Sequence, residues 1–193
     1  DGAVSLTGLS GPAAFNVTGD GYGVFVTGAA SSAAVTSAAA SGAGGIGAWA
    51  ENGGSIQVAG DAQGVTAGAG ASEAGSSVTV GGHVTAGEFG AFARIGGSVI
   101  VTGYAAASGA DGIGAQAESG GSIQVTGDAQ GVFCGAYASE AGSSVTVGGH
   151  TASSGLNGFG AYARISGSVI VTGHAAASGA DGVGARAESG GII

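Results

Sequence analysis

The sequence contains very little proline, cysteine or positive charge, and each shortage excludes a class of protein. Only 1 of the 193 residues is proline whereas 46 are glycine, which excludes collagen, because collagen needs abundant proline and glycine at every third position. The single cysteine cannot form an internal disulfide, so cysteine usage leaves the redox compartment open. Lysine is absent, and three scattered arginines against twelve acidic residues give a net charge of −9, which argues against nucleic-acid binding.

Long apolar runs are also absent. No stretch approaches the roughly 20 apolar residues that cross a bilayer, so we expect no membrane insertion of this segment. No signal peptide is recognisable, and the start at Asp1 without methionine predicts a mature or excised fragment. Apolar residues nevertheless make up 44% of the chain and its mean hydropathy is +0.43, which favours folding over disorder. Much of this apolar content is alanine, so we expect a thin core.

Two short motifs alternate along the chain. One reads serine, an aliphatic residue, any residue, valine, any residue and glycine, and it starts at Ser55, Ser77, Ser98, Ser122, Ser144 and Ser168. The other reads Gly-Ala-x-Ala and starts at Gly47, Gly68, Gly90, Gly114, Gly135, Gly160 and Gly184. Alternation with period two predicts two short strands in each repeat of 21–24 residues, and no segment shows helical spacing.

Repeats of this length predict an all-β fold, a single-stranded right-handed parallel β-solenoid (β-helix) of about eight coils. Coils stacked at ~4.8 Å pair every backbone group with the coils above and below, for a rod of ~38 Å. We expect one continuous domain of regular repeats over residues 30–193. Residues 1–29 are expected to form an irregular coil or cap, with Pro12 and the glycosylation sequon Asn16-Val17-Thr18. The chain stops inside a strand motif without a polar cap, so we expect a longer parent chain or stacking on another molecule.

Stacked coils place equivalent residues in columns. The aliphatic residues of the serine motif, such as Val99 and Val101, are predicted to face inward, together with both alanines of each Gly-Ala-x-Ala motif. The column that contains Ile46, Phe89 and Cys134 is also expected to face inward. Cys134 would then be a buried, inert thiol.

Outward columns reveal a larger repeat of three coils. The position after each Gly-Ala-x-Ala motif reads Glu51, Ser72, Arg94, Glu118, Ser139, Arg164 and Glu188. Arg94 is predicted to face Glu118 and Arg164 to face Glu188, and such opposite charges on neighbouring strands help to fix the register. The near-identical segments 97–121 and 167–191 therefore occupy the same layer of successive three-coil blocks.

A corner column after the glycine of the serine motif holds carboxylates and imidazoles. It reads Asp61, His83, Tyr104, Asp128, His150 and His174. The Asp61–His83 and Asp128–His150 pairs could share a metal or form ion pairs, but two side chains are too few for a metal site. We expect surface decoration, with no metal and no cofactor. A Ser–His–Asp triad would need a Gly-x-Ser-x-Gly elbow, which does not accompany these residues, so we expect no enzyme.

Another outward column, at the middle of the Gly-Ala-x-Ala strands, carries the aromatic residues Trp49, Phe92, Tyr137 and Tyr162. Stacked aromatic side chains on an exposed face can hold a sugar ring or bind a partner chain. They can equally stiffen a flat face through cross-strand contacts. Both interpretations stay open, and the candidate binding residues are Trp49, Phe92, Tyr137, Tyr162, Asp61, His83, Asp128 and His150.

The runs GGSIQVTGDAQG and GIGAQAESGG resemble the repeats of bacterial surface β-helices, in particular autotransporter-like and adhesin-like passengers, and the resemblance covers about residues 30–193. It implies an extracellular or cell-surface rod that holds a binding face away from the cell. We therefore expect a structural or adhesive rod segment that passively binds a glycan or a host or matrix surface. The alternative is a fibre subunit that self-associates through the solenoid ends. A carbohydrate-active β-helix enzyme is less favoured, because its cleft needs long loops with clustered aspartates and basic residues.

Overall fold

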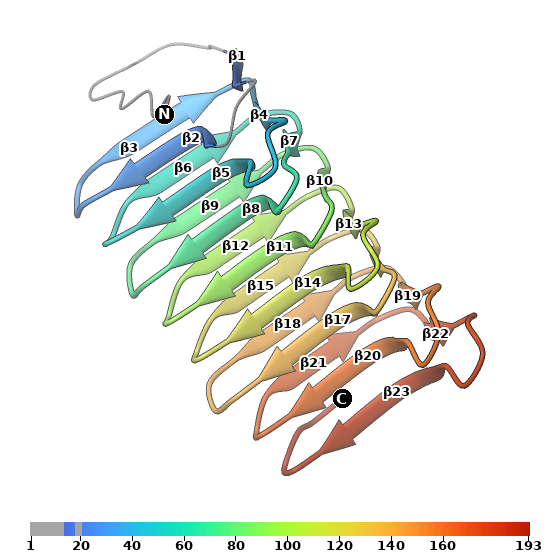
Figure 1. Ribbon diagram of the computed structural model, residues 1–193. Helices are drawn as coiled ribbons and strands as arrows, with labels where there is room; N and C mark the ends of the chain where they lie inside the picture. The colour runs from blue at the N-terminus through green and yellow to red at the C-terminus, as the bar shows by residue number, and fades with distance from the viewer. Residues whose placement is uncertain (1–13, 18–20) are drawn as a thin grey trace.

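The chain folds into a stack of parallel strands (Figure 1). The computed structural model describes residues 14–17 and 21–193, and within these ranges it contains no helix. Three sheets run along the stack, and each coil contributes one strand to sheet B, then one to sheet C, then one to sheet A. In Figure 1 the colour advances steadily from β2 in blue to β23 in red. The predicted parallel β-solenoid is confirmed, with about seven turns where about eight coils were predicted.

The strands of each sheet follow one another in the order of the stack. Sheet B consists of β2 (Tyr22–Thr27), β5 (Ile46–Glu51), β8 (Ala67–Ser72), β11 (Phe89–Arg94), β14 (Ile113–Glu118), β17 (Cys134–Ser139), β20 (Phe159–Arg164) and β23 (Val183–Glu188). Sheet C consists of β3 (Ser32–Val35), β6 (Ser55–Val58), β9 (Ser77–Val80), β12 (Ser98–Val101), β15 (Ser122–Val125), β18 (Ser144–Val147) and β21 (Ser168–Val171). Sheet A consists of β1 (Ala14–Val17), β4 (Ser37–Ala40), β7 (Ala62–Gln63), β10 (Val84–Ala86), β13 (Ala105–Ala107), β16 (Ala129–Gly131), β19 (Thr151–Ser153) and β22 (Ala175–Ala177).

Sheet A corrects the expectation of two strands in each repeat. Its strands are short, and most contain only alanine, glycine and polar residues, so they show neither the length nor the β-branched content that indicates a strand in a sequence. They form because the neighbouring coils supply hydrogen-bond partners on both sides. Val84, for example, is paired with Ala62 in the preceding coil and with Ala105 in the following coil.

The interior is narrow and consists of small side chains. Sheet C contributes fully buried valines such as Val99 and Val101, while sheet B contributes fully buried alanines such as Ala91. These residues belong to one apolar cluster that continues from Val24 to Val169. Each buried valine contributes roughly 1.5–3 kcal/mol by the hydrophobic effect, so the valine column is a main source of stability.

A glycine at the second position of each sheet B strand lets sheets A and B pack closely. A Cβ added to Gly90 would lie 2.8 Å from the backbone nitrogen of Ala106 in sheet A, too close for any side chain. The pairing of β5 with β8 passes from Ile46 directly to Ala48, so Gly47 interrupts the regular alternation. The strand therefore bends at its glycine.

Tight turns with positive φ join sheet B to sheet C. In the turn Glu51–Gly54 the first carbonyl accepts a hydrogen bond from the last N–H at 3.0 Å, and the central residues Asn52 and Gly53 have φ of 54° and 82°. The same hydrogen bond closes the turns Arg94–Gly97, Glu118–Gly121, Arg164–Gly167 and Glu188–Gly191. Asparagine and glycine are the residues that adopt this backbone conformation most readily.

The first layer of the stack is only partly described. β1 pairs with β4, and β2 pairs with β5, both in parallel. Pro12 and the sequon residue Thr18 lie outside the described residues. The irregular layer expected for residues 1–29 therefore stays a prediction.

Candidate binding surface

The four aromatic residues singled out from the sequence lie on sheet B in one column. Trp49 in β5 and Phe92 in β11 lie on either side of β8, and their ring centroids are 6.1 Å apart. The ring of Trp49 extends over Gly70, where any side chain would collide with it. Tyr137 and Tyr162 occupy adjacent strands with ring centroids 5.3 Å apart. The structure thus brings the four together as two pairs.

These rings are largely covered. Trp49 is 7% exposed and Tyr162 is 8% exposed, whereas Phe92 and Tyr137 are half-buried. Contacts between neighbouring rings stabilise the face, as one of the two interpretations of this column expects. Phe92 and Tyr137 keep the larger exposed surface for contact with a ligand.

A second apolar column lies beside the aromatic column. Phe89 stacks on Phe92 with centroids 5.1 Å apart, and Phe159 stacks on Tyr162 at 4.7 Å. The members of each pair are three residues apart in one strand, and they share a face because the strand bends at the intervening glycine. The expectation that the column of Phe89 and Cys134 faces the core is therefore wrong, because these residues pack with the tyrosines in a cluster separate from the core.

Cys134 is fully buried within this cluster. Its thiol donates a hydrogen bond to the backbone oxygen of Ala136 at 3.2 Å. Burial raises the pKa of the thiol to about 12, an effect that hydrogen bonds to the backbone only partly offset. The thiol stays protonated at neutral pH and is a poor nucleophile, as the sequence led us to expect.

Arg94 lies opposite Glu118 in the strand register, as predicted, but its side chain packs elsewhere. The guanidinium carbon is 5.7 Å from the ring centroid of Trp49 and 5.9 Å from that of Phe92. Its Nε donates a hydrogen bond to Ser72 Oγ at 3.2 Å. Cation–π contacts of this kind contribute about 0.5–1 kcal/mol at exposed sites. The predicted ion pair between Arg94 and Glu118 is not formed, and the Arg94 guanidinium instead covers the rings of Trp49 and Phe92.

One hydrogen bond recurs in every third coil of sheet B, from the middle side chain of the strand to the glutamate two residues later. It joins Trp49 Nε1 to Glu51 at 3.3 Å, Gln116 Nε2 to Glu118 at 3.3 Å and Arg186 Nη2 to Glu188 at 2.8 Å. The last is also the one ion pair within the described part of the chain, so the predicted Arg164–Glu188 pair is not formed. The three-coil repeat therefore preserves a contact although the donor changes.

Tyr162 and Glu188 interact between adjacent strands. The tyrosine hydroxyl donates a hydrogen bond to the carboxylate, and this bond lowers the pKa of Glu188. Burial, followed by the same bond, raises the pKa of Tyr162. Interaction with Tyr137 raises the pKa of Arg164. This end of the face therefore carries a carboxylate and a guanidinium next to two tyrosine side chains.

The corner column forms hydrogen bonds from backbone to side chain between successive coils. Asp61 Oδ1 accepts a hydrogen bond from the backbone N–H of His83 at 2.7 Å. His83 Nδ1 in turn accepts one from the backbone N–H of Tyr104 at 3.2 Å, and the two rings stack with centroids 4.0 Å apart. The imidazole must therefore carry its proton on Nε2 when it accepts this bond.

The same ladder recurs three coils later. Asp128 Oδ1 accepts from the N–H of His150 at 2.7 Å, and His150 Nδ1 accepts from the N–H of His174 at 2.9 Å. The structure thus brings together both Asp–His pairs chosen from the sequence, but their polar atoms cap backbone groups. Within the described residues, no three His, Cys, Asp or Glu side chains gather as metal ligands would.

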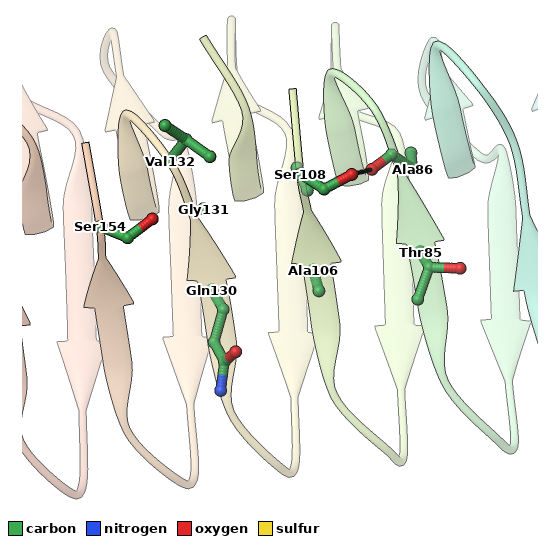
Figure 2. Close-up of a pocket in the computed structure, with 9 residues that line it drawn as sticks. Thr85, Ala86, Ala106, Ser108, Gln130, Gly131, Val132 and Ser154 are labelled. Carbon is green, nitrogen blue, oxygen red and sulfur yellow. Dashed lines mark hydrogen bonds between the residues drawn. The ribbon is translucent and has the colours of Figure 1, made fainter. Parts of the chain in front are cut away.

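A shallow groove of about 400 Å³ runs across the outer face of sheet A (Figure 2). Thr85, Ala106 and Gln130 line it from β10, β13 and β16, whose strands pair in that order. Ser108 also lines it and donates a hydrogen bond to the carbonyl of Ala86 at 3.4 Å. Of the described residues that line the groove, none is charged. It offers hydroxyl and amide groups but no acid–base pair.

No family model, no curated protein and no solved structure matches this chain. Across residues 14–17 and 21–193 there is no helix with the length and apolar character to cross a bilayer.

Two surface features were not predicted from the sequence. The outward column of Phe89 and Phe159 was missed because simple alternation ignores the bend at each glycine. The groove on sheet A was missed because its strands were not recognised. The invariant glycine of the Gly-Ala-x-Ala motif was the available signal, since glycine inside a strand often marks a bulge or a close backbone approach.

Proposed function

We propose that this chain is a segment of a structural and adhesive rod in an extracellular or cell-surface protein. It binds a glycan or a matrix surface passively through the outer face of sheet B. The observation that carries this proposal is the continuous face of eight aligned strands with two adjacent apolar columns and flanking charges. Aromatic residues and arginine are the residue types enriched where proteins meet their partners.

A passive role fits the chemistry of the described surface better than catalysis does. The corner carboxylates and imidazoles accept hydrogen bonds from the backbone, and Cys134 is buried and protonated. The groove on sheet A is lined by neutral side chains. Rigid stacking of coils, which needs no bound group, supplies the mechanical role.

Binding to arrayed glycans and to immobilised matrix proteins tests the adhesive role. Phe92→Ser and Tyr137→Ser should each weaken binding about tenfold, because both remove half-buried rings from sheet B. Thr85→Ala and Gln130→Ala, on sheet A, are matched controls and should bind as the wild type does. Equal binding by all four variants would contradict the proposal, and release of sugar products would point to the enzyme alternative.

Electron microscopy of the purified chain tests the rod against the fibre. Discrete short particles support a rod segment, whereas long filaments would favour the subunit that stacks end to end.

Antibody access on intact source cells tests the location. Labelling only after lysis would contradict an extracellular or surface position.

A further inference from the structure

A hollow of about 240 Å³ opens on the outer face of sheet B, beside the aromatic column. Its lining includes Ile46 from β5, Phe89 from β11 and, between them, Ala67 at the start of β8 and Thr66 directly before it. The hollow exists because these two middle residues are small while the side chains of the coils on both sides are large. We propose that it binds a phenylalanine-like side chain of a partner protein, an inference that rests on the adhesive role proposed above.

The second three-coil block contains the counterpart of this hollow. Ala67 pairs with Ile46 on one side and Phe89 on the other, and Cys134 pairs in the same way with Ile113 and Phe159. Residues 66–67 therefore correspond to residues 133–134. In the second block the pair is phenylalanine and cysteine instead of threonine and alanine.

The counterpart is filled by the chain itself. The ring of Phe133 packs edge-on against Phe159, with centroids 5.6 Å apart and an interplanar angle of 83°. Phe159 occupies the place that Phe89 has in the first block. The two blocks share backbone register, so a phenyl ring entering the hollow meets the equivalent aromatic partner, Phe89. Edge-to-face packing is a preferred arrangement of two aromatic rings.

Size and polarity agree with this occupant. An enclosed apolar cavity of about 150 Å³ is large enough for benzene, so the hollow accommodates one ring with space for the groups that carry it. Glu51 and Arg94 also line the hollow and bear opposite charges. A peptide that flanks the inserted ring presents both N–H donors and carbonyl acceptors, which these two side chains can satisfy.

Titration of the full chain with toluene, the side-chain analogue of phenylalanine, tests the site by NMR. We expect saturable shifts at Ile46, Ala67 and Phe89. The double variant Thr66→Phe with Ala67→Cys places the two residues of the second block in the hollow and should weaken toluene binding about tenfold or more. Its circular dichroism and unfolding midpoint should match those of the wild type. Undiminished binding by a correctly folded variant would overturn the proposal.

The converse change creates a second hollow. Phe133→Thr with Cys134→Ala should give a chain that binds two toluene molecules instead of one. If this variant does not fold, the Thr66→Phe with Ala67→Cys variant tests the proposal alone. A folded variant that still binds one molecule would contradict the correspondence between the two blocks.

Two further probes identify the class of ligand. A capped Gly-Phe-Gly peptide should compete with toluene, whereas capped Gly-Leu-Gly should compete about tenfold less well. Saturation of the hollow by methyl β-glucoside in place of the aromatic probes would overturn the assignment to a protein side chain. These titrations use the isolated chain. If no toluene binds, adhesion through the rest of sheet B is still possible. If the chain does not adhere to glycans or matrix proteins, a positive toluene titration still supports the hollow as a binding site.

Discussion

Single residues in the turns between sheets B and C differ in how well they suit a positive φ. Ile95 and Gly96 adopt φ of 51° and 78°, whereas Ile165 and Ser166 adopt 50° and 63° in the equivalent turn three coils later. For residues other than glycine and asparagine this region costs roughly 1–2 kcal/mol each, and β-branched residues suit it least. Ser166 therefore stores strain that glycine avoids at the equivalent position 96 of the first block.

Replacing Ser166 by glycine should relieve this strain. We expect Ser166→Gly to raise the free energy of unfolding by about 0.5–1 kcal/mol, because the lower native-state strain exceeds the entropy that glycine adds to the unfolded chain. Urea denaturation measures the change. Gly120→Ser is the matched control, since φ is 82° there and the atom nearest to an added Cβ lies 3.8 Å away. It should lose a similar amount, and unchanged midpoints in both variants would refute the argument.

Cys134 should make stability sensitive to alkaline pH. Its thiol has a pKa of about 12 in the folded chain against 9.0 when unperturbed, so the unfolded chain ionises first. The stabilisation is complete below pH 9.0 and is lost as pH rises from there towards 12, at about 1.4 kcal/mol per pH unit. Unfolding of the wild type and of Cys134→Ala, compared across this range, checks the sign. A stability difference between them that does not change with pH would contradict it.

Among the elements, sheets B and C could be predicted from the sequence and sheet A could not. Strands such as Ser98–Val101 alternate valine with exposed residues over a full strand, and they pair in the predicted register. Ala105–Ala107 has no such alternation, and only its neighbours in the stack hold it extended. The local sequence indicates which side chains of a strand are buried. A short alanine strand is instead held by contacts with residues about two dozen positions away in the sequence.

The candidate site was likewise only partly predictable from the sequence. The column of Trp49 and Phe92 was predictable, because it occupies one position of a clear repeat. The outward direction of Phe89 was not, because it depends on the bend at Gly90, which follows from the distance between sheets A and B. The sequence predicted that Asp61 and His83 would lie close together, but not that they accept hydrogen bonds from backbone N–H groups of the next coil. Backbone N–H groups are common to nearly all residues, so the sequence pattern of side chains does not indicate them.

Gly90→Ala should disrupt an element junction. The added methyl group would clash with the backbone oxygen of Gly114 in the next strand of sheet B and would lie 2.8 Å from the backbone nitrogen of Ala106, so the packing of sheet B and sheet A must shift. We expect a loss of about 3 kcal/mol or more, comparable to severe overpacking. Gly44→Ala is the control, because an added Cβ there meets no atom within 4 Å. Thermal unfolding should separate the two variants clearly, and similar melting temperatures would show that the junction tolerates a side chain.

The whole molecule should tolerate removal of one complete three-coil block. Deleting residues 100–169 joins Val99 to Ile170 and restores the sequence SVIV of the strand Ser98–Val101. Each coil contacts mainly its neighbours, so the shortened chain should fold with every column in register. Small-angle scattering should show a rod shorter by ~14 Å, three times the strand spacing.

A deletion that ignores the repeat is the control for this experiment. Removing residues 100–158 joins Val99 to Phe159 and therefore connects half a strand of sheet C to a strand of sheet B. This chain should aggregate or lose its β-sheet circular dichroism. If both deletions fold equally well, stacking in register does not govern the fold.

The narrow interior also has a consequence for engineering. Because the described coils enclose similar valine, isoleucine and alanine side chains, outward residues can differ between coils while the backbone stays the same. Thr66 and Phe133 illustrate this freedom at one equivalent position. A combinatorial library confined to the outward positions of one block should therefore yield new specificities on an unchanged scaffold.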